Sequence, residues 1–343
     1  MKVTIKDVAK KSGVSVATVS LVLHGNPRIS TETRKRVLKA IDDLDYQPSP
    51  LARGLVMRYT GNIGFVLTED HFLRTEPFYT RIFLGTEFGA RDSDHFVLLA
   101  TIPTDFKNSD LLPRFITQKS VDGLIIAGKV PQAFLAKLMR YHLPIVFVDY
   151  YPPEGEFSAI LMDNLRGGMM ATRHLIDLGH RNIAFLAGDL QHPSIKERYL
   201  GYQSALQQHG IPLNPELEVI KEKTTGKESG YKAVCTLMSR GVSFSAIFAC
   251  NDAMAIGAME CLKERGLKIP DDISVVGFDD IESDVFQNPP LTTVSVPKYD
   301  MGIEAMQLMR EMLKQKKRTT KKIIVPVKLI VRESTAVFND SES

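Results

Sequence analysis

The chain has 343 residues, 44% of them hydrophobic, which is enough to build two or three separate hydrophobic cores. No apolar run is long enough to span a membrane and no apolar signal segment follows Met1, so we expect a cytoplasmic protein without a membrane partner. The net charge of +3 is unevenly distributed, because residues 1–60 contain eleven Lys and Arg but five Asp and Glu. This basic beginning favours contact with a polyanion, although a solvated basic helix surface would give the same composition.

Residues 4–24 have the pattern of two short helices joined by a tight turn. Thr4 is a candidate N-cap, and Asp7, three residues later, is placed to accept a hydrogen bond from it and to interact favourably with the helix dipole. Gly13 is expected to end the first helix, because glycine adopts the left-handed conformation at little cost, and Ser15 is expected to cap the second. A helix pair with a glycine-containing turn is typical of a DNA-binding helix-turn-helix, and an ordinary helical hairpin is the alternative.

A third helix is predicted over residues 31–44, with Ser30 as its cap. Val37, Ile41 and Leu44 recur at helical spacing, and they are expected to close a small core under the first two helices. Residues 1–47 therefore predict an all-α domain.

A series of short motifs follows the chain from the first helix onward. The motifs are TIKDVA at 4–9, GVS at 13–15, ATVS at 17–20, TRKRV at 33–37, YQP at 46–48 and LARGL at 51–55. In this order they resemble the LacI/GalR family of bacterial transcription regulators, and the resemblance continues across the rest of the chain. It implies a repressor that binds double-stranded operator DNA and is controlled by a small-molecule effector.

The resemblance implies that the second helix lies in the major groove and that Val16, Ala17 and Leu21 read bases. These apolar side chains can contact thymine methyl groups, but they cannot form bidentate hydrogen bonds with guanine or adenine. Leu21 departs from the family, since many members carry arginine there, so the operator of a relative cannot be assumed for this chain. The polar candidates for DNA contacts are Thr4, Ser15, Thr18, Ser20, His24 and Asn26. For His24, a solvated helix end is the alternative.

Residues 48–60 are predicted to form a short hinge helix and a linker. Ser49 would cap the helix, and Pro50 falls at its first position, where the missing N–H costs nothing. In the family, two copies of this helix pair on DNA. The resemblance assigns Leu55 to a wedge in the minor groove, with Ala52 facing the partner helix and Arg53 near the DNA backbone. A plain linker is the alternative.

From residue 61 onward, short apolar runs alternate with helical segments. Strands are predicted at 63–67, 97–100, 124–127, 145–148, 183–187, 246–250 and 274–277. Helices are predicted at 78–92, 131–141, 165–178, 195–209, 227–240, 252–265 and 299–315. This repetition predicts an α/β fold with doubly wound parallel sheets.

The number of βα units suits two lobes, and the resemblance implies a periplasmic-binding-protein-like body at 61–343 for effector binding and dimerisation. Lobe 1 is expected to cover about 61–163 and 294–325, and lobe 2 about 164–291 and 326–343. The chain would return to lobe 1 near residues 291–293. The predicted architecture is therefore an all-α head and hinge helix followed by a two-lobed α/β body.

Polar residues follow several predicted strands, at the edge where parallel sheets bind their ligands. Asp149, Asn251 and Asp279 each come at or just after a strand end, and Arg198 lies early in the helix that follows strand 183–187. The resemblance implies that Arg198, Asn251 and Asp279 hydrogen-bond the effector. A carboxylate can accept from two adjacent hydroxyls and a guanidinium donates in a planar fork, which suits a polyhydroxy ligand such as a sugar.

Aromatic rings would cover the apolar side of a sugar ring, and the candidates are Phe78, Tyr79, Tyr150 and Phe278. Core packing is an equally weighted alternative for each ring. Purine-responsive members of the family carry an aromatic residue at the position matching Thr225, which disfavours a stacked purine here. We therefore expect a sugar or a short oligosaccharide as effector.

The chain lacks HExxH and GxSxG motifs, and its three cysteines, Cys235, Cys250 and Cys261, lack metal-ligand spacing. We expect no enzyme, no cofactor and no metal site, and we expect reduced thiols. Two alternatives remain open: a regulator that answers a non-sugar effector or a partner protein, and a sugar-binding protein without a regulatory role. The expected assembly is a homodimer on a pseudo-palindromic operator, because a two-fold dimer presents its DNA-binding surface twice.

Overall fold

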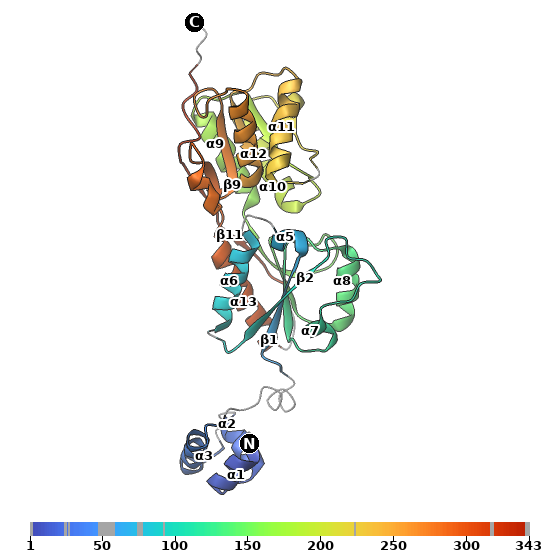
Figure 1. The fold of residues 1–343 in the computed structure, drawn as a ribbon, viewed down its shortest axis with the longest axis vertical. Coiled ribbons are helices and arrows are strands. Elements are labelled where there is room, and N and C mark those ends of the chain that lie inside the picture. Colours follow the sequence, from blue (N-terminus) through green and yellow to red (C-terminus); the bar gives the residue numbers. More distant parts are fainter. Residues whose placement is uncertain are drawn as a thin grey trace. The chain divides into compact units, whose positions relative to one another are not determined.

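The computed structural model describes residues 3–23, 26, 28–46, 59–73, 78–91, 93–222, 224–315 and 319–339 (Figure 1). The chain divides into two units, Met1–Gly61 and Asn62–Ser343, here termed the head and the body. Each unit is described on its own.

The head contains three helices, α1 (Ile5–Ser12), α2 (Val16–Leu23) and α3 (Thr31–Asp43). Local capping sets their starts as the sequence predicts. The backbone N–H and the hydroxyl of Thr4 donate to the Asp7 carboxylate at 2.8 and 2.6 Å, and the N–H of Thr18 donates to Ser15 Oγ at 3.1 Å. Gly13 ends α1 at a φ of 65°, which glycine tolerates without strain.

The core of the head is small and is built from one face of each helix. Val8, Val19 and Val37 are fully buried, and each such side chain contributes about 1.5–3 kcal/mol by leaving water. Ile41 and Leu44, which the sequence predicts to face inward, are partly buried and pack against this cluster, as does Leu23. The helical spacing therefore fixes which faces pack together.

The first sheet of the body has the strand order β11-β5-β4-β3-β1-β2, and all its neighbouring strands are parallel. The strands are β1 (Asn62–Thr68), β2 (Phe96–Ile102), β3 (Gly123–Ala127), β4 (Ile145–Val148), β5 (Ser158–Met162) and β11 (Lys322–Val325). Helices cover both faces, as expected of a doubly wound sheet. Ile63 and Ile125 pack in the same cluster as helices α6 (Phe78–Arg91) and α13 (Lys298–Lys314).

The second sheet has the order β12-β10-β9-β8-β6-β7, and only the β10–β12 pair is antiparallel among its described pairs. The strands are β6 (Ile183–Leu186), β7 (Glu218–Val219), β8 (Ala246–Ala249), β9 (Ser274–Asp279), β10 (Thr292–Ser295) and β12 (Lys328–Ile330). Two helix pairs accompany it, α9 (Asn164–Asp177) with α10 (Pro193–Gln208), and α11 (Lys227–Ser239) with α12 (Asp252–Glu264). Figure 1 shows the two sheets in separate lobes of the body.

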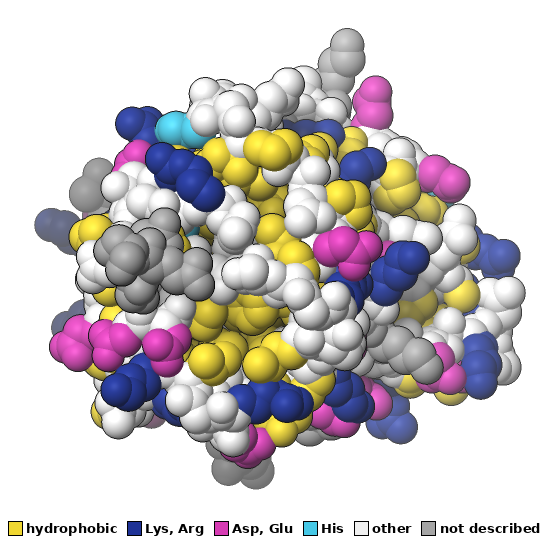
Figure 2. Space-filling model, turned by 90° about the horizontal axis from the view of Figure 1, so that it is seen from above, with side chains coloured by type: hydrophobic (Ala, Val, Ile, Leu, Met, Phe, Trp, Pro, Cys, Tyr) yellow, Lys and Arg dark blue, Asp and Glu magenta, His cyan; other side chains and the backbone are white. Residues whose placement is uncertain are grey.

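Short elements complete the body. They are α5 (Glu69–Leu73), α7 (Arg114–Thr117), α8 (Gln132–Leu138), η1 (Met139–Tyr141), η2 (Pro215–Leu217) and the 3₁₀ turn η3 (Glu282–Phe286). Within the described ranges, no helix combines the length and apolarity that crossing a lipid bilayer would require. Figure 2 shows Lys and Arg side chains beside Asp and Glu around one face of the molecule, with hydrophobic side chains nearer its middle.

All seven predicted strands are present. Strands β7 and β10–β12, which are short, polar or partly exposed, were not predicted, and neither was β5, although β5 is buried and as long as the predicted β3. The predicted return to lobe 1 at residues 291–293 is wrong. Thr292 and Thr293 belong to β10 and pair with β9 in the second sheet. The chain therefore returns to lobe 1 a few residues later than predicted, at Val296–Pro297, just before α13. A strand rich in threonine resembles a linker, although β-branched residues favour strands.

Candidate DNA interface and ligand pocket

The outward face of α2 is apolar. Val16 and Leu21 are each 41% exposed, Ala17 is also exposed, and Val19 and Val22 on the opposite side are buried. Large exposed apolar side chains on a small domain are a feature of contact surfaces. The three residues assigned to base reading are therefore accessible to a molecule that docks on α2. Their side chains present methyl groups and have no hydrogen-bond donor or acceptor.

The polar candidates in the head have structural partners. Thr4, Ser15 and Thr18 take part in the caps of α1 and α2, and Ser15 Oγ and Thr18 Oγ1 lie 2.9 Å apart. Asn26 holds the segment between α2 and α3, since its Oδ1 accepts from the N–H of Arg28 at 2.9 Å and its carbonyl accepts from Arg34 at 2.7 Å. Ser20 is half-buried on α2.

Four predicted DNA contacts cannot be placed. His24, Ala52, Arg53 and Leu55 lie outside the described residues, as does the predicted hinge helix. Their roles stay predictions.

The body contains a cavity of about 400 Å³ that both lobes line. Lobe 1 contributes Asp70, His71, Phe78, Tyr79 and Asp149. Lobe 2 contributes His192, Ser194, Ile195, Arg198, Thr224, Thr225, Gly226, Lys227, Cys250, Asn251, Ala253, Ile256, Asp279 and Ile281. A cavity of this size, with a few polar groups among apolar ones, is typical of a small-molecule site.

Topology explains why these residues meet. β1, β4, β8 and β9 all end at the cavity, and Asp149, Cys250 and Asp279 stand at or just after those ends. The parallel strands of each sheet bring their carboxyl ends to one edge, and that edge of both sheets lines the same cavity, so residues distant in sequence become neighbours there.

Arg198 is the most fully engaged polar side chain of the cavity. It is 5% exposed, its Nε donates to Asn164 Oδ1 at 2.9 Å, and its Nη1 donates to the Cys250 carbonyl at 2.6 Å. Nη2 lies 3.3 Å from Asp279 Oδ1, and the guanidinium lies 3.6 Å from the centre of the Phe278 ring. These contacts fix the planar fork in one orientation.

Asp279 stands at the end of β9 in a backbone conformation with φ of 122°, which is rare for a residue with a side chain. Its carboxyl is 15% exposed. Burial raises the pKa of Asp279 to about 7, opposed by the charge of Arg198 and assisted by the nearby Asp252 carboxylate. Asp279 can therefore change charge near neutral pH.

A second carboxylate, Asp149, links the two lobes. Its Oδ2 accepts from the Tyr79 hydroxyl at 2.8 Å, and its Oδ1 accepts from Ser194 Oγ of lobe 2 at 3.2 Å. Asp149 has a positive φ of 58°, so the strand end turns sharply to aim this side chain into the cavity. A ligand that binds here competes with, or bridges, an existing polar contact.

Asn251 lines the cavity but already uses its amide. Oδ1 accepts from the N–H of Met254 at 2.9 Å and caps α12, and Nδ2 donates to the Thr225 carbonyl at 2.9 Å. The residue therefore couples the start of α12 to the loop before α11.

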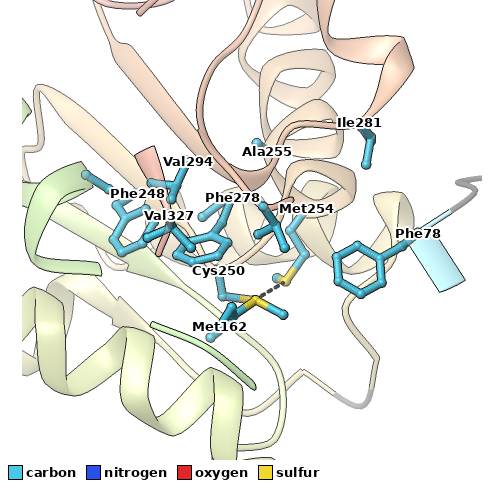
Figure 3. Close-up of a cluster of buried hydrophobic side chains, with 14 of the residues drawn as sticks. Phe78, Met162, Phe248, Cys250, Met254, Ala255, Phe278, Ile281, Val294 and Val327 are labelled. Carbon is cyan, nitrogen blue, oxygen red and sulfur yellow. Dashed lines mark hydrogen bonds between the residues drawn. The ribbon is translucent and has the colours of Figure 1, made fainter. Parts of the chain in front are cut away.

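Two of the four aromatic candidates do not line the cavity. Phe278 is fully buried beneath Arg198, and Figure 3 shows it among Phe248, Val294 and other core side chains. Tyr150 is buried against Phe147, with its ring 6.1 Å from that of Phe147. Core packing therefore accounts for both rings. Phe78 and Tyr79 line the cavity, and Phe78 stands at the edge of the cluster in Figure 3.

Sequence reasoning missed several lining residues, notably His71, His192, Ser194 and Lys227. His71 stacks on Tyr79 with ring centres 4.4 Å apart. Lys227 begins the predicted helix 227–240, but the strand before that helix, β7, has two residues and was not predicted, so no strand end pointed to Lys227. His71 follows β1 by only a few residues, but its helix α5 is too short to be recognised from periodicity.

Two further contacts join the lobes beside the cavity. Lys298, at the start of α13, donates to the carbonyl oxygens of Asp279 and Asp280, at 2.9 Å for Asp280. Arg81 of α6 pairs with Glu282 of η3. The loop that carries Asp279 is thus held by two helices of lobe 1.

Comparisons with known proteins match both the head and the body of the chain. The model for bacterial regulatory proteins of the lacI family matches residues 4–49, and the model for a periplasmic binding protein-like domain matches residues 172–335. The HTH-type transcriptional repressor PurR of Pasteurella multocida is 33% identical over 333 residues, covering 96% of this chain and 98% of its own.

Solved structures are similar over nearly the whole chain. The complex of transcriptional regulator CelR with cellobiose gives a TM-score of 0.73 at 30% identity, covering 97% of this chain and 99% of that chain. The Lac repressor dimer bound to operator and the anti-inducer ONPF gives a TM-score of 0.78 at 26% identity, covering 98% of this chain and 100% of that chain.

Proposed function

This chain belongs to the LacI family of bacterial regulatory proteins, and on that premise we propose that it represses carbohydrate-utilisation genes under the control of a sugar bound between its lobes. It is a DNA-binding transcription regulator and not an enzyme. The observation that carries the choice of ligand is the arrangement of Asp279, Arg198 and the aromatic pair Phe78 and Tyr79 around one cavity.

The cavity chemistry supports a polyhydroxy ligand. Asp279 and Asp149 offer carboxylate oxygens that accept from hydroxyl groups, and the Arg198 guanidinium holds Asp279 in place. Phe78 and Tyr79 offer ring surface for the C–H side of a sugar. The CelR relative was solved with cellobiose, which is a ligand of this class.

The interlobe contacts support a route from ligand to dimer. A sugar that binds Asp279 acts on a loop held by Lys298 of α13 and Arg81 of α6. These two helices also pack on each other closely enough that a Cβ on Gly85 would collide with the Tyr299 carbonyl. A change in the angle between the lobes therefore moves α6 and α13 together.

An exposed apolar face on lobe 1 supports a homodimer. Leu84 and Phe88 of α6 are 44% and 46% exposed, and the ring of Phe88 lies 5.8 Å from that of Tyr299 of α13. Phe96 and Leu99 lie exposed on β2, an edge strand of the first sheet. Exposed edges and apolar patches are commonly covered by a partner, and a second copy of the chain is the partner proposed here.

Operator binding uses α2 and, as predicted from the sequence, Leu55 of the hinge. Two heads of a homodimer bind the half-sites of a pseudo-palindromic duplex, and sugar binding changes their spacing. Ligand and operator must then alter each other's affinity by the same factor. Leu55→Ala is expected to weaken operator binding, measured by gel shift. Unchanged affinity would contradict the proposal that Leu55 inserts into the minor groove.

The experiment that tests the ligand is a thermal-shift screen of the full chain against sugars, nucleosides and sugar phosphates. A sugar is expected to raise the melting temperature and to change affinity for an operator selected in vitro. A response to nucleosides alone, or a sugar response without any effect on DNA binding, would contradict the proposal. Sedimentation of Phe88→Asp beside the native chain tests the dimer, and an unchanged dimer would move the interface elsewhere.

A further inference from the structure

Two cysteines from neighbouring helices lie in contact in lobe 2. Cys235 of α11 and Cys261 of α12 have their Sγ atoms 3.5 Å apart. Cys261 is fully buried and Cys235 is half-buried, so one thiol of the pair can be reached from solvent. Nothing in the proposed regulatory function uses either side chain.

The helix backbones approach closely near this pair. A Cβ on Gly230 of α11 would collide with the Met254 carbonyl of α12, and a Cβ on Gly257 of α12 would collide with the Lys227 carbonyl of α11. Both glycines precede their cysteine by about one helical turn. The two sulfurs are thus brought together by the main chain, and rotation of the side chains would close the remaining gap to a bond of about 2.05 Å.

A cation lies against both sulfurs. Arg265, just after α12, donates from Nη2 to Cys235 Sγ at 3.2 Å and from Nε to Cys261 Sγ at 3.4 Å. A guanidinium in this position stabilises the thiolate, which is the form that reacts with oxidants. Burial raises the pKa of the Cys261 thiol, so the accessible Cys235 is the better first nucleophile and Cys261 the better second.

The third cysteine is placed differently. Cys250 is buried at the end of β8, and its Sγ lies 3.6 Å from the thioether sulfur of Met254, which cannot form a disulfide (Figure 3). Cys250 therefore serves as an internal control.

We propose that Cys235 and Cys261 form a peroxide-responsive dithiol that closes to a disulfide between α11 and α12. The Cys235 thiolate attacks one oxygen of hydrogen peroxide, an S–O bond forms, the O–O bond breaks, and the leaving hydroxide takes a proton to become water. The Cys261 sulfur, giving up its proton, then attacks the sulfenic sulfur, an S–S bond forms, and the second oxygen leaves as water. Two thiols are oxidised by two electrons, and one peroxide is reduced to two waters.

The disulfide would join two walls of the ligand cavity. α11 begins at Lys227 and α12 is capped by Asn251, and both residues line the cavity. The cross-link would therefore restrict any movement of these two helix starts relative to each other. Oxidation of the two cysteines would in this way change the mobility of the walls of the ligand cavity.

The test uses the full-length chain, reduced and then exposed to hydrogen peroxide. Titratable thiols are expected to fall from the three cysteines of the chain to one, with a loss of two hydrogen atoms in intact mass and recovery with dithiothreitol. Peptide mapping should join the peptides of Cys235 and Cys261, and the melting temperature should rise by about 5 °C.

Variants decide between the cysteines. Cys250→Ser should still lose two thiols, whereas Cys235→Ser and Cys261→Ala should form no internal cross-link. Arg265→Gln should slow the reaction about tenfold at equal peroxide. Three intact thiols, disulfides between chains, or oxygen addition without a cross-link would each overturn the proposal, and none of these outcomes bears on operator or sugar binding.

Discussion

Arg198 Nη2 lies 3.3 Å from Asp279 Oδ1, which joins α10 to the end of β9 at the wall of the ligand cavity. The guanidinium has further bonds to Asn164 and the Cys250 carbonyl, so its position does not depend on Asp279 alone. Asp279 in contrast has one charged partner at 3.3 Å and part of its carboxyl facing the cavity. A ligand can therefore use the free side of Asp279 while Arg198 holds the carboxylate in place.

Asp279→Asn removes this charge while keeping the shape of the side chain. We expect the ligand-induced melting shift to disappear, and affinity for the ligand to fall by about 10–100-fold, because a charge-assisted hydrogen bond is lost. Operator affinity without ligand should stay within about twofold of the native chain, as measured by gel shift. Asp271→Asn, at an exposed position outside the cavity lining, is the matched control. A retained melting shift in Asp279→Asn would place the ligand elsewhere.

Ligand binding is expected to depend on pH near neutrality. Since burial raises the pKa of Asp279 to about 7, lowering the pH from 8 to 6 protonates the carboxyl and removes the charge that accepts hydroxyl groups. Ligand affinity of the native chain should therefore weaken over this interval, as followed by calorimetry. Asp279→Asn should show no such step, and identical pH profiles for the two proteins would assign the dependence to another group.

Leu21 tests the base-reading face of α2. Leu21→Ala removes exposed apolar surface, so it should weaken binding to a selected operator by about tenfold and leave stability within about 0.5 kcal/mol. Leu38→Ala, on α3 with a side chain 50% exposed, is the control of the same residue type. Equal affinity losses for both variants, or none for Leu21→Ala, would exclude a specific role for this side chain.

A buried carboxyl pair gives a prediction about stability. Asp252 and Asp284 are both fully buried, and Asp252 accepts from Thr293 Oγ1 at 2.6 Å and from the N–H of Ile281 at 3.2 Å. Asp284 has no salt bridge among the described residues closer than Arg332 Nη1 at 4.0 Å. Burial, followed by the charge of Asp252, raises the pKa of Asp284 far above its usual value of 3.8, so its carboxyl is neutral at pH 7.

A group with a raised folded-state pKa stabilises the protein below its unfolded pKa, and this contribution is lost as pH rises through the folded value. Unfolding free energy of the native chain should therefore fall with rising pH above about 4 relative to Asp284→Asn, whose amide cannot ionise. Below about pH 4, where the carboxyl is protonated in both folded and unfolded states, the variant should lie within about 1 kcal/mol of the native chain. At pH 7 the variant should be the more stable of the two relative to that starting difference, because only the native chain has lost stability by ionisation of its unfolded state. Urea denaturation at several pH values measures this difference, and parallel curves would show that Asp284 is already ionised.

Much of the head could be predicted from sequence because its determinants are local. The Thr4–Asp7 cap, the left-handed Gly13 and the Ser15 and Ser30 caps each act within about four residues. Periodicity likewise predicted the strands that end at the ligand cavity, whereas the family resemblance grouped Arg198, Asn251 and Asp279, and all three line that cavity. Caps, turns and strand ends are each determined by residues close together in the sequence, so a short segment is enough to predict them.

The tertiary structure alone decided which side chains at the strand ends face the cavity. Tyr150 and Phe278 follow the same strand-end rule as Asp149 and Asp279, yet both rings pack in the core. The pairings of Asp252 with Asp284 and of Cys235 with Cys261 also join residues that no local pattern relates. Strand order and helix packing create these contacts across the folded chain, because long-range neighbours are set by how whole elements stack and not by the preference of any one residue.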